Sequence, residues 1–173
     1  VKKGKTNHIG FSEISPDSLR RASKIHHIAA VQSEYSLSTR AAELGLKQAC
    51  AELGTALVAF SPVGRTFLTD TPMPYNTGQE LPFTKNNPRF MQPHYAANIA
   101  RTEKFRAYAA DNGMAAATLA IAWLLNQGGH ILPIPGTRSV DHLGEVAAAM
   151  SVSLSPDMMD EIETILPVGW AAG

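Results

Sequence analysis

The chain has 173 residues, with 45% hydrophobic content and 15 basic residues that balance 15 acidic ones, which fits one globular domain or part of a larger one. The near-zero net charge argues against nucleic acid or an anionic membrane as the main partner, and no apolar run approaches the roughly 20 residues of a membrane helix. Cys50 is the only cysteine, so no internal disulfide can form and a reducing cytoplasm is the expected compartment.

The chain opens on a basic stretch, residues 1–8, that is typical of a helix end with Gly4 as its stop. We therefore expect further residues before Val1. An apolar run at 8–11 then predicts the first strand. Ser15, followed at once by Pro16, predicts the cap and first turn of a helix that ends near residue 25, because a serine hydroxyl accepts free N–H groups there and proline has none to leave unpaired.

Two further apolar runs predict strands at 28–35 and 56–61. The sequence between them predicts a helix over 39–54, and Gly54 marks its end because glycine readily adopts the left-handed backbone of a helix terminus. After the second of these strands, residues 69–95 are rich in proline and have little periodicity. That segment is too long for an ordinary connection, so it predicts either a functional lid or disorder.

The last part of the chain predicts helices over 97–112 and 114–127, a fourth strand at 130–137, and two final helices at 139–150 and 155–166. Strands that alternate with helices are typical of a parallel sheet, because parallel strands need a crossover between them. The strand runs are continuously apolar, which predicts a sheet covered on both faces. Four such strands fit either a small open sheet or half of a (β/α)8 barrel.

Polar and small residues follow each predicted strand at its carboxyl end, which is where parallel β/α folds bind ligands. These residues are Ser12 and Glu13; Gln32, Ser33 and Glu34; Ser61, Gly64 and Arg65; and Gly136, Thr137, Arg138 and Ser139. The same pattern at the ends of four strands favours a binding site over ordinary polar loops.

The fourth strand carries the most informative motif, "PGTRSVDHLGE". It places a glycine turn, a hydroxyl, Arg138 and a helix N-terminus within a few residues, and the helix N-terminus offers free N–H groups to phosphate. Arg138 adds a fork of donors suited to phosphate, and His142 lies one turn further on. The same residues also fit a capped helix beside a solvated arginine, and this stretch alone leaves both interpretations open.

Several stretches together resemble the C-terminal half of an aldo-keto reductase. They are "VKKGKTNHIGFSEIS", "AAVQSEYSLSTR", "LVAFSPVGRTFL", "ILPIPGTRSVDHLGE" and "ILPVGWAAG", in the family's order and spacing. The resemblance covers the whole chain, residues 1–173. It implies a (β/α)8 TIM barrel of which this chain supplies about the last four β/α units, and a truncated oxidoreductase that uses NADPH (NADP+) to reduce aldehydes or ketones to alcohols.

The same resemblance implies a cofactor site along the strand ends. Ser12 and Gln32 would bind the nicotinamide carboxamide, and Phe60 would stack on its ring. The pyrophosphate would lie against Ser61, Val63, Gly64 and Arg65, and the adenosine 2′-phosphate against Gly136, Thr137, Arg138 and Ser139, with His142 and Glu145 beside the adenosine. Three positions differ from many relatives: Glu13 and Val146 replace Asn, and His142 replaces Arg. NADPH is therefore the expected cofactor, with NADH as the alternative.

The family's catalytic Asp, Tyr, Lys and His all belong to its N-terminal half, so no catalytic residue is assigned on this chain. Four tyrosines have suitable chemistry but lie outside the family's context: Tyr35, Tyr75, Tyr95 and Tyr108. Glu13 and Glu34 would lie on neighbouring strands and could form an acid–base pair, although the family gives them no such role.

Other polar or reactive residues favour structural roles. His26 and His27 lack a third ligand at metal-binding spacing, which favours a solvated helix end, and Cys50 lies in a helical pattern that favours a small core residue. No metal site is expected.

Two hypotheses of different class follow. In the first, the chain is the NADPH-binding half of a carbonyl reductase. In the second, it is a stand-alone, catalytically inactive half-barrel that acts as a dinucleotide-binding or assembly module. In either case its outer strands need an N-terminal half or self-association to cover them, because open strand edges invite pairing.

Overall fold

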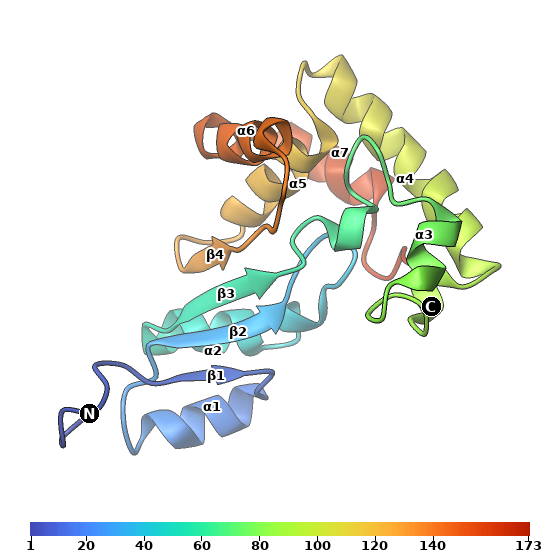
Figure 1. Cartoon of the computed structure of the whole chain (residues 1–173). Coiled ribbons are helices and arrows are strands. Elements are labelled where there is room, and N and C mark those ends of the chain that lie inside the picture. Colours follow the sequence, from blue (N-terminus) through green and yellow to red (C-terminus); the bar gives the residue numbers. More distant parts are fainter.

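The computed structural model describes residues 1–173, and at its centre lies one four-stranded parallel sheet (Figure 1). The strands are β1 (Gly10–Ser12), β2 (Ala30–Glu34), β3 (Ala56–Phe60) and β4 (Ile131–Pro133). They lie side by side in chain order, β1-β2-β3-β4, and every neighbouring pair is parallel. The four predicted strands and their parallel arrangement are confirmed.

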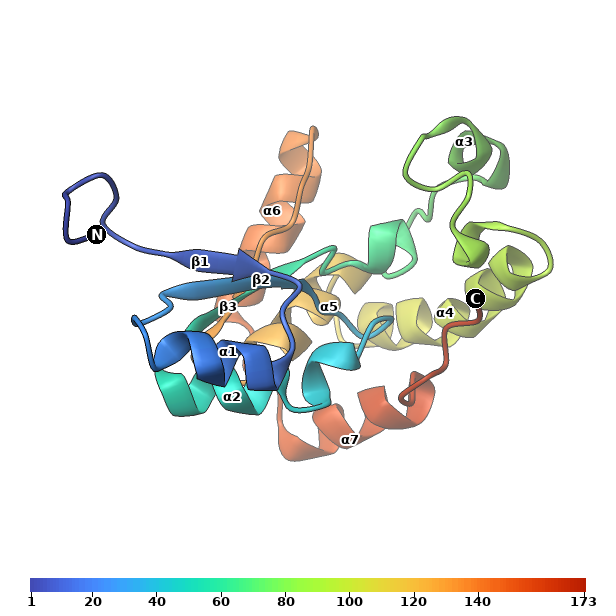
Figure 2. The same cartoon turned by 90° about the horizontal axis from the view of Figure 1, so that it is seen from below.

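The register divides the sheet into a covered face and an open face. Val31, Leu57 and Ile131 are paired across three strands, and each is at most 2% exposed. The neighbouring row is Ser12, Gln32, Val58 and Leu132, and the Leu132 side chain in it is 49% exposed. In Figure 2, α1 and α2 lie on one side of the strands and leave the other side open. The expectation that both faces are covered is therefore wrong for this chain, whose helices cover only one.

Helix α1 (Pro16–Ser23) begins as predicted, with the Ser15 side chain accepting from the Ser18 N–H. The single helix predicted over 39–54 is wrong in one respect. Gly45 has a φ of +104° and interrupts it, so that a short 3₁₀ turn, η1 (Ala41–Glu43), precedes α2 (Leu46–Leu53). Residues 1–9 form turns and irregular chain rather than the predicted helix end.

The long segment after β3 is folded into three short pieces before a helix begins. They are the turn η2 (Gly64–Thr66), helix α3 (Tyr75–Glu80) and the turn η3 (Pro88–Phe90). Phe67, Phe90 and Tyr95 pack together here, with the Phe67 and Phe90 ring centroids 4.8 Å apart. Residues 69–95 are thus an ordered excursion beyond the carboxyl ends of the strands (Figure 1).

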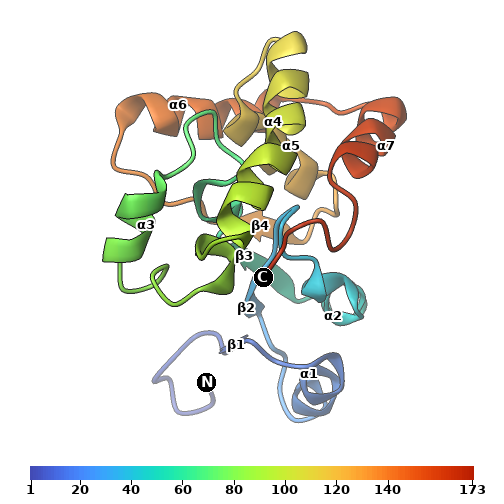
Figure 3. The same ribbon diagram turned by 90° about the vertical axis from the view of Figure 1, so that its right-hand side faces the viewer.

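Four helices complete the chain: α4 (His94–Asp111), α5 (Ala116–Leu125), α6 (Val140–Ala148) and α7 (Pro156–Ile165), with η4 (Ala149–Ser151) after α6. Almost every side chain of α5 is buried, as its apolar composition predicts. Figure 3 places α6 and α7 on opposite sides of α4 and α5. Asn98 of α4 binds the chain's tail through two hydrogen bonds with the backbone of Ala172.

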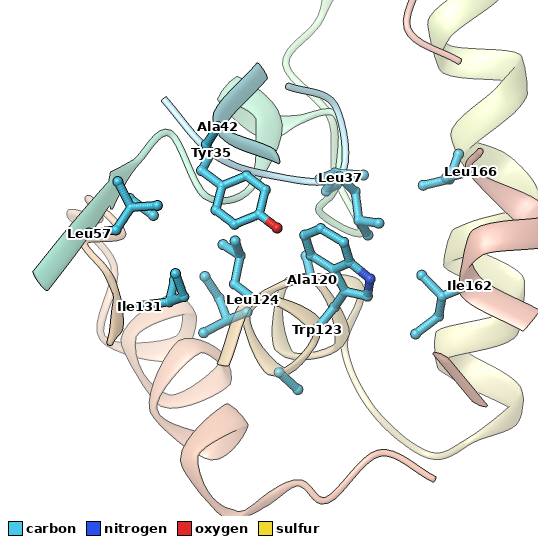
Figure 4. Close-up of a cluster of buried hydrophobic side chains, with 14 of the residues drawn as sticks. Tyr35, Leu37, Ala42, Leu57, Ala120, Trp123, Leu124, Ile131, Ile162 and Leu166 are labelled. Carbon is cyan, nitrogen blue, oxygen red and sulfur yellow. The ribbon is translucent and has the colours of Figure 1, made fainter. Parts of the chain in front are cut away.

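The core lies between the covered face of the sheet and helices α2, α5 and α7 (Figure 4). Tyr35 and Trp123 meet edge to face with centroids 5.7 Å apart. The Arg40 guanidinium lies 4.5 Å from the centre of the Trp123 ring and also pairs with Glu43 and Glu163. This cluster ties the end of β2 to α5 and α7 and so fixes the carboxyl edge of the sheet. No helix is both long and apolar enough to cross a membrane.

Candidate functional site

The turn after β3 has a backbone that few residues adopt. Ser61, Gly64, Arg65 and Thr66 all have positive φ, between +51° and +83°. At Gly64 a Cβ atom would lie 2.7 Å from the Ser38 side-chain oxygen, so only glycine fits there. Non-glycine residues in this conformation are costly and persist where the surrounding structure holds them, often at binding sites. The "SPVGR" motif therefore forms a turn with a strained, left-handed backbone that the surrounding residues hold in place.

The turn after β4 brings the second predicted group of residues to the same place. Ser139 caps α6 by accepting from the His142 N–H, and the Ser139 N–H donates to the Thr137 hydroxyl oxygen at 3.1 Å. A side chain at Gly136 would meet no atom within 4 Å, so the backbone there is open to approach. The predicted capped helix is confirmed, and its phosphate-binding role stays a prediction.

Two adjoining recesses join these turns at the carboxyl end of the sheet. The first is lined by Ser61, Val63, Arg65, Gly136 and Arg138, together with Pro62, Thr66, Met73, Leu81, Phe83 and Ile134. The second is lined by Val63, Gly136, Thr137, His142 and Glu145, together with Thr66, Thr69, Asp70, Thr71, Ala117, Pro135 and Val146. Val63, Thr66 and Gly136 line both. The structure thus brings together eight of the sequence-predicted residues from separate turns.

The five other predicted residues lie around these recesses. Ser12 of β1 and Gln32 of β2 are adjacent in register and exposed on the open face of the sheet, and β2 is the strand next to β3. Phe60 ends β3 opposite Glu34. Gly64 is buried and shapes the turn, and Ser139 caps α6. The predicted residues therefore follow one edge of the sheet from β1 to β4.

Sequence reasoning missed several residues that line the recesses. Asp70 accepts the Ala116 N–H with both carboxylate oxygens and so fixes the start of α5 beside the second recess. The Thr66 hydroxyl accepts the Met73 N–H at 2.8 Å, which holds Met73 near the first recess. Phe83, from the segment 69–95 that was predicted as a lid, also lines the first recess and is 58% exposed. No spacing in the sequence indicates these contacts, because they depend on the fold of residues 66–83.

A network of charges lies beside the first recess. The Arg65 guanidinium pairs with the Glu34 carboxylate at 3.1 Å. Glu13, whose φ is +49°, accepts from the Ser33 hydroxyl and from the Glu34 N–H, both at 3.0 Å. Glu13 and Glu34 are neighbours as expected. Because both carboxylates are engaged by donors within this chain, their use as an acid–base pair finds no support in these contacts.

The tyrosines and the cysteine nearest the core have environments unsuited to proton transfer. Tyr35 is fully buried and donates to Glu43 at 2.7 Å, and burial raises its pKa far above the usual range. Burial likewise raises the pKa of Tyr95, whose hydroxyl donates to the Met73 carbonyl. Burial also raises the pKa of the Cys50 thiol to about 11. No group of three or more His, Cys, Asp or Glu side chains is placed to hold a metal ion.

Comparison with known proteins identifies the family. The model of the aldo/keto reductase family matches residues 1–167. The chain belongs to the aldo/keto reductase family. It is 39% identical over its whole length to probable aldo-keto reductase 1 of Glycine max. It is also 37% identical, over 94% of its length, to a protein of Schizosaccharomyces pombe named aldo-keto reductase yakc, NADP(+). The chain spans about half the length of these curated relatives, 50% and 48%.

Solved structures agree on the fold. Glycerol dehydrogenase from Gluconobacter oxydans superposes on 95% of this aldo/keto reductase chain with a TM-score of 0.80 at 22% sequence identity. A thermostable aldo-keto reductase crystallised with the inhibitor epalrestat superposes with a TM-score of 0.70 at 23% identity. The chain covers 50% of each of these structures. At this identity the likeness supports the α/β fold of the family and its parallel sheet.

Proposed function

We propose that this chain is the C-terminal, NADPH-binding half of an aldo-keto reductase barrel. The observation that carries the proposal is that Arg65 and Arg138, 73 positions apart in sequence, line one recess at the carboxyl end of the sheet. Two guanidinium groups beside a hydroxyl and an open glycine backbone suit the phosphates of a dinucleotide. The relative from Schizosaccharomyces pombe, whose name includes NADP(+), supports the choice of cofactor.

The donor set fits each part of that cofactor. Ser61, Val63, Gly64 and Arg65 would hold the pyrophosphate at the shaped turn. Gly136, Thr137, Arg138 and Ser139 would hold the 2′-phosphate, with His142 and Glu145 beside the adenosine. Ser12 and Gln32 would donate to or accept from the carboxamide of the nicotinamide, and Phe60 would lie against its ring. From the 2′-phosphate through the pyrophosphate to the nicotinamide carboxamide, these groups would follow the strand ends from β4 back to β1.

The reaction proposed for the complete barrel is the reduction of an aldehyde or ketone to an alcohol. Bound NADPH supplies a hydride for the carbonyl carbon in such reactions. This chain's contribution would be to bind and orient the dinucleotide, while residues 69–95 form one wall of the carbonyl pocket. Phe83 and Met91 are exposed on that segment, 58% and 46%, which suits an apolar substrate. The general acid would come from outside residues 1–173.

The sheet's outer strands indicate what completes the site. Phe11 of β1 is 39% exposed, and Ile25, just after α1, is 90% exposed. Leu132 of β4 and Ile134, just after that strand, are 49% and 44% exposed. Exposed apolar groups and unpaired strand edges are costly and prone to association. We propose that four further β/α units, equivalent to the half of the relatives that this chain does not span, pair with β1 and β4. Eight strands is the number at which side chains fill such a barrel.

The alternative is a stand-alone module that binds dinucleotide without catalysis, and the observation that favours it is that residues 1–173 line both recesses by themselves. A complementation experiment distinguishes the enzyme from the stand-alone module. The chain would be co-expressed with the part of the soybean relative that it does not match, and the complex would be isolated and assayed with NADPH and aromatic aldehydes. A one-to-one complex with reductase activity supports the enzyme. A homodimer of this chain that does not bind the added half supports the module and contradicts the proposed pairing.

The cofactor site itself is tested by titrating the chain with NADPH and following nucleotide fluorescence. We expect saturable binding that Arg138→Ala weakens at least about tenfold, since a charge-assisted pair is lost. Arg21→Ala is the matched control, because Arg21 lies on α1 away from both recesses. Equal affinity in the wild-type chain and Arg138→Ala, or no binding by a folded chain, would contradict the proposed site.

A further inference from the structure

The ion pair between Glu34 and Arg65 connects the end of β2 to the turn after β3. Its 3.1 Å contact is made by one guanidinium nitrogen of Arg65, and no other side-chain or backbone acceptor is within hydrogen-bonding distance of that guanidinium. The Arg65 side chain is 27% exposed and Glu34 is 21% exposed. Arg65 lines the first recess, whereas Glu34 lines a different one with Thr39 and Arg89. The pair thus stands at the boundary between two recesses.

Glu34 is held by more than Arg65. Its second carboxylate oxygen accepts from the Thr39 hydroxyl at 3.1 Å, and Thr39 in turn accepts from Arg89 at 2.7 Å. Its backbone N–H donates to Glu13. The carboxylate is therefore fixed in place without the arginine, whereas Arg65 has Glu34 as its one partner. Of the two groups, Arg65 is the one with freedom to change partners.

From this asymmetry we infer that Glu34 is an internal competitor for Arg65 that weakens binding of the dinucleotide pyrophosphate. The inference rests on the proposed cofactor site. A pyrophosphate at the Ser61–Arg65 turn would have to draw the guanidinium away from a carboxylate that is already fixed. The ion pair that it would have to break is partly buried, where opposite charges attract each other more strongly than in water. Glu34 thereby sets the affinity of the site.

If Glu34 helped binding instead of competing with it, the substitution would change the affinity in the opposite direction. If Glu34 positioned Arg65 for the ligand, removal of its charge would loosen the guanidinium and weaken binding. A competitor predicts tighter binding instead. The substitution Glu34→Gln separates the two, because glutamine keeps an oxygen for the Thr39 hydroxyl and removes only the charge. The control is Glu52→Gln, which removes the same charge from another arginine pair, Arg20–Glu52 at 2.9 Å, outside the recesses.

The experiment is calorimetric titration of the chain with NADP+ and, separately, with adenosine 2′-monophosphate, which has no pyrophosphate. We expect Glu34→Gln to bind NADP+ about tenfold more tightly than the wild-type chain, with Glu52→Gln unchanged. Neither variant should change the affinity for the monophosphate. In an Arg65→Met background the gain from Glu34→Gln should disappear. Glu34→Asp, which shortens the carboxylate by one methylene, should show a smaller gain and serves if the glutamine variant does not fold.

Each result decides one of the two proposals. NADP+ binding that is unchanged or weaker in Glu34→Gln overturns the competitor role and leaves the cofactor site standing. A gain that survives in the Arg65→Met background also overturns it, because the effect would not pass through that pair. If the folded chain binds neither NADP+ nor the monophosphate in any variant, the proposed function itself fails, and the competitor role fails with it.

Discussion

Gly64 offers a sharp test of the turn that shapes the candidate site. Its φ is +58°, and a Cβ atom would lie 2.7 Å from the Ser38 side-chain oxygen. Gly54 has nearly the same backbone conformation, with a φ of +62°, but a Cβ there would meet no atom within 4 Å. The two glycines therefore separate the cost of a left-handed backbone from the cost of a steric clash.

The magnitudes follow from that difference. Gly54→Ala should lower the free energy of unfolding by about 1–2 kcal/mol, the usual cost of a left-handed alanine. Gly64→Ala carries the same cost plus about 1–3 kcal/mol for overpacking, which totals about 2–5 kcal/mol. Urea unfolding followed by the fluorescence of the two buried tryptophans, Trp123 and Trp170, measures both variants. In thermal unfolding each 1 kcal/mol corresponds to a melting temperature lower by about 2–4 °C.

A second substitution isolates the clash. Ser38→Ala removes the oxygen that the new methyl group would meet, at the cost of its hydrogen bond with the Ser36 hydroxyl at 2.9 Å. Added to Gly64→Ala, it should destabilise the chain by less than the sum of the two single changes. Equal losses for Gly54→Ala and Gly64→Ala, or strictly additive effects in the double variant, would refute this account of the turn.

Three further predictions concern the core and the tail. Burial alone would raise the pKa of Glu43, but hydrogen bonds from Arg40 and Tyr35 lower it, so the ionised Glu43 stabilises the fold above about pH 4.3 and this stabilisation is lost as the pH falls through the lowered pKa. The urea midpoints of the wild-type chain and Glu43→Gln should therefore converge in acid, and a constant gap between them would contradict this. Cys50, buried and with a pKa raised to about 11, should react with a thiol reagent at pH 8 only after unfolding, so fast labelling of the folded chain would count against its placement. Asn98→Ala removes two hydrogen bonds to the tail and should cost about 1–3 kcal/mol with faster amide exchange at residues 170–173, whereas unchanged exchange there would show that the tail is held otherwise.

Much of the fold could be predicted because local chemistry agrees with the final structure. The apolar runs at 28–35 and 56–61 became neighbouring strands, and the serine caps at Ser15 and Ser139 each mark a helix start. The break at Gly45 was missed because the residues on both sides of it favour a helix. The uncovered face was missed because a continuously apolar strand indicates burial without saying which polypeptide buries it.

The candidate site was predictable to the extent that its residues follow strand ends. Ser61 to Arg65 and Gly136 to Ser139 are readable as turns at the carboxyl edge, and the structure brings both to adjoining recesses. The Glu34–Arg65 pair was not predicted, because it depends on a side-chain direction set by the left-handed backbone at Arg65. Asp70 was missed because its position depends on the path of the excursion over 69–95.

Amide hydrogen exchange with and without NADP+ tests the central claim most directly, because it locates the ligand on the chain. We predict that saturating NADP+ slows exchange at residues 61–66 and 134–146 and leaves the backbone of α1 and α2 unchanged. The same protection should be weaker in the Arg138→Ala variant. Protection confined to other elements, or none at either turn in a folded chain that binds the nucleotide, would contradict the proposed cofactor site.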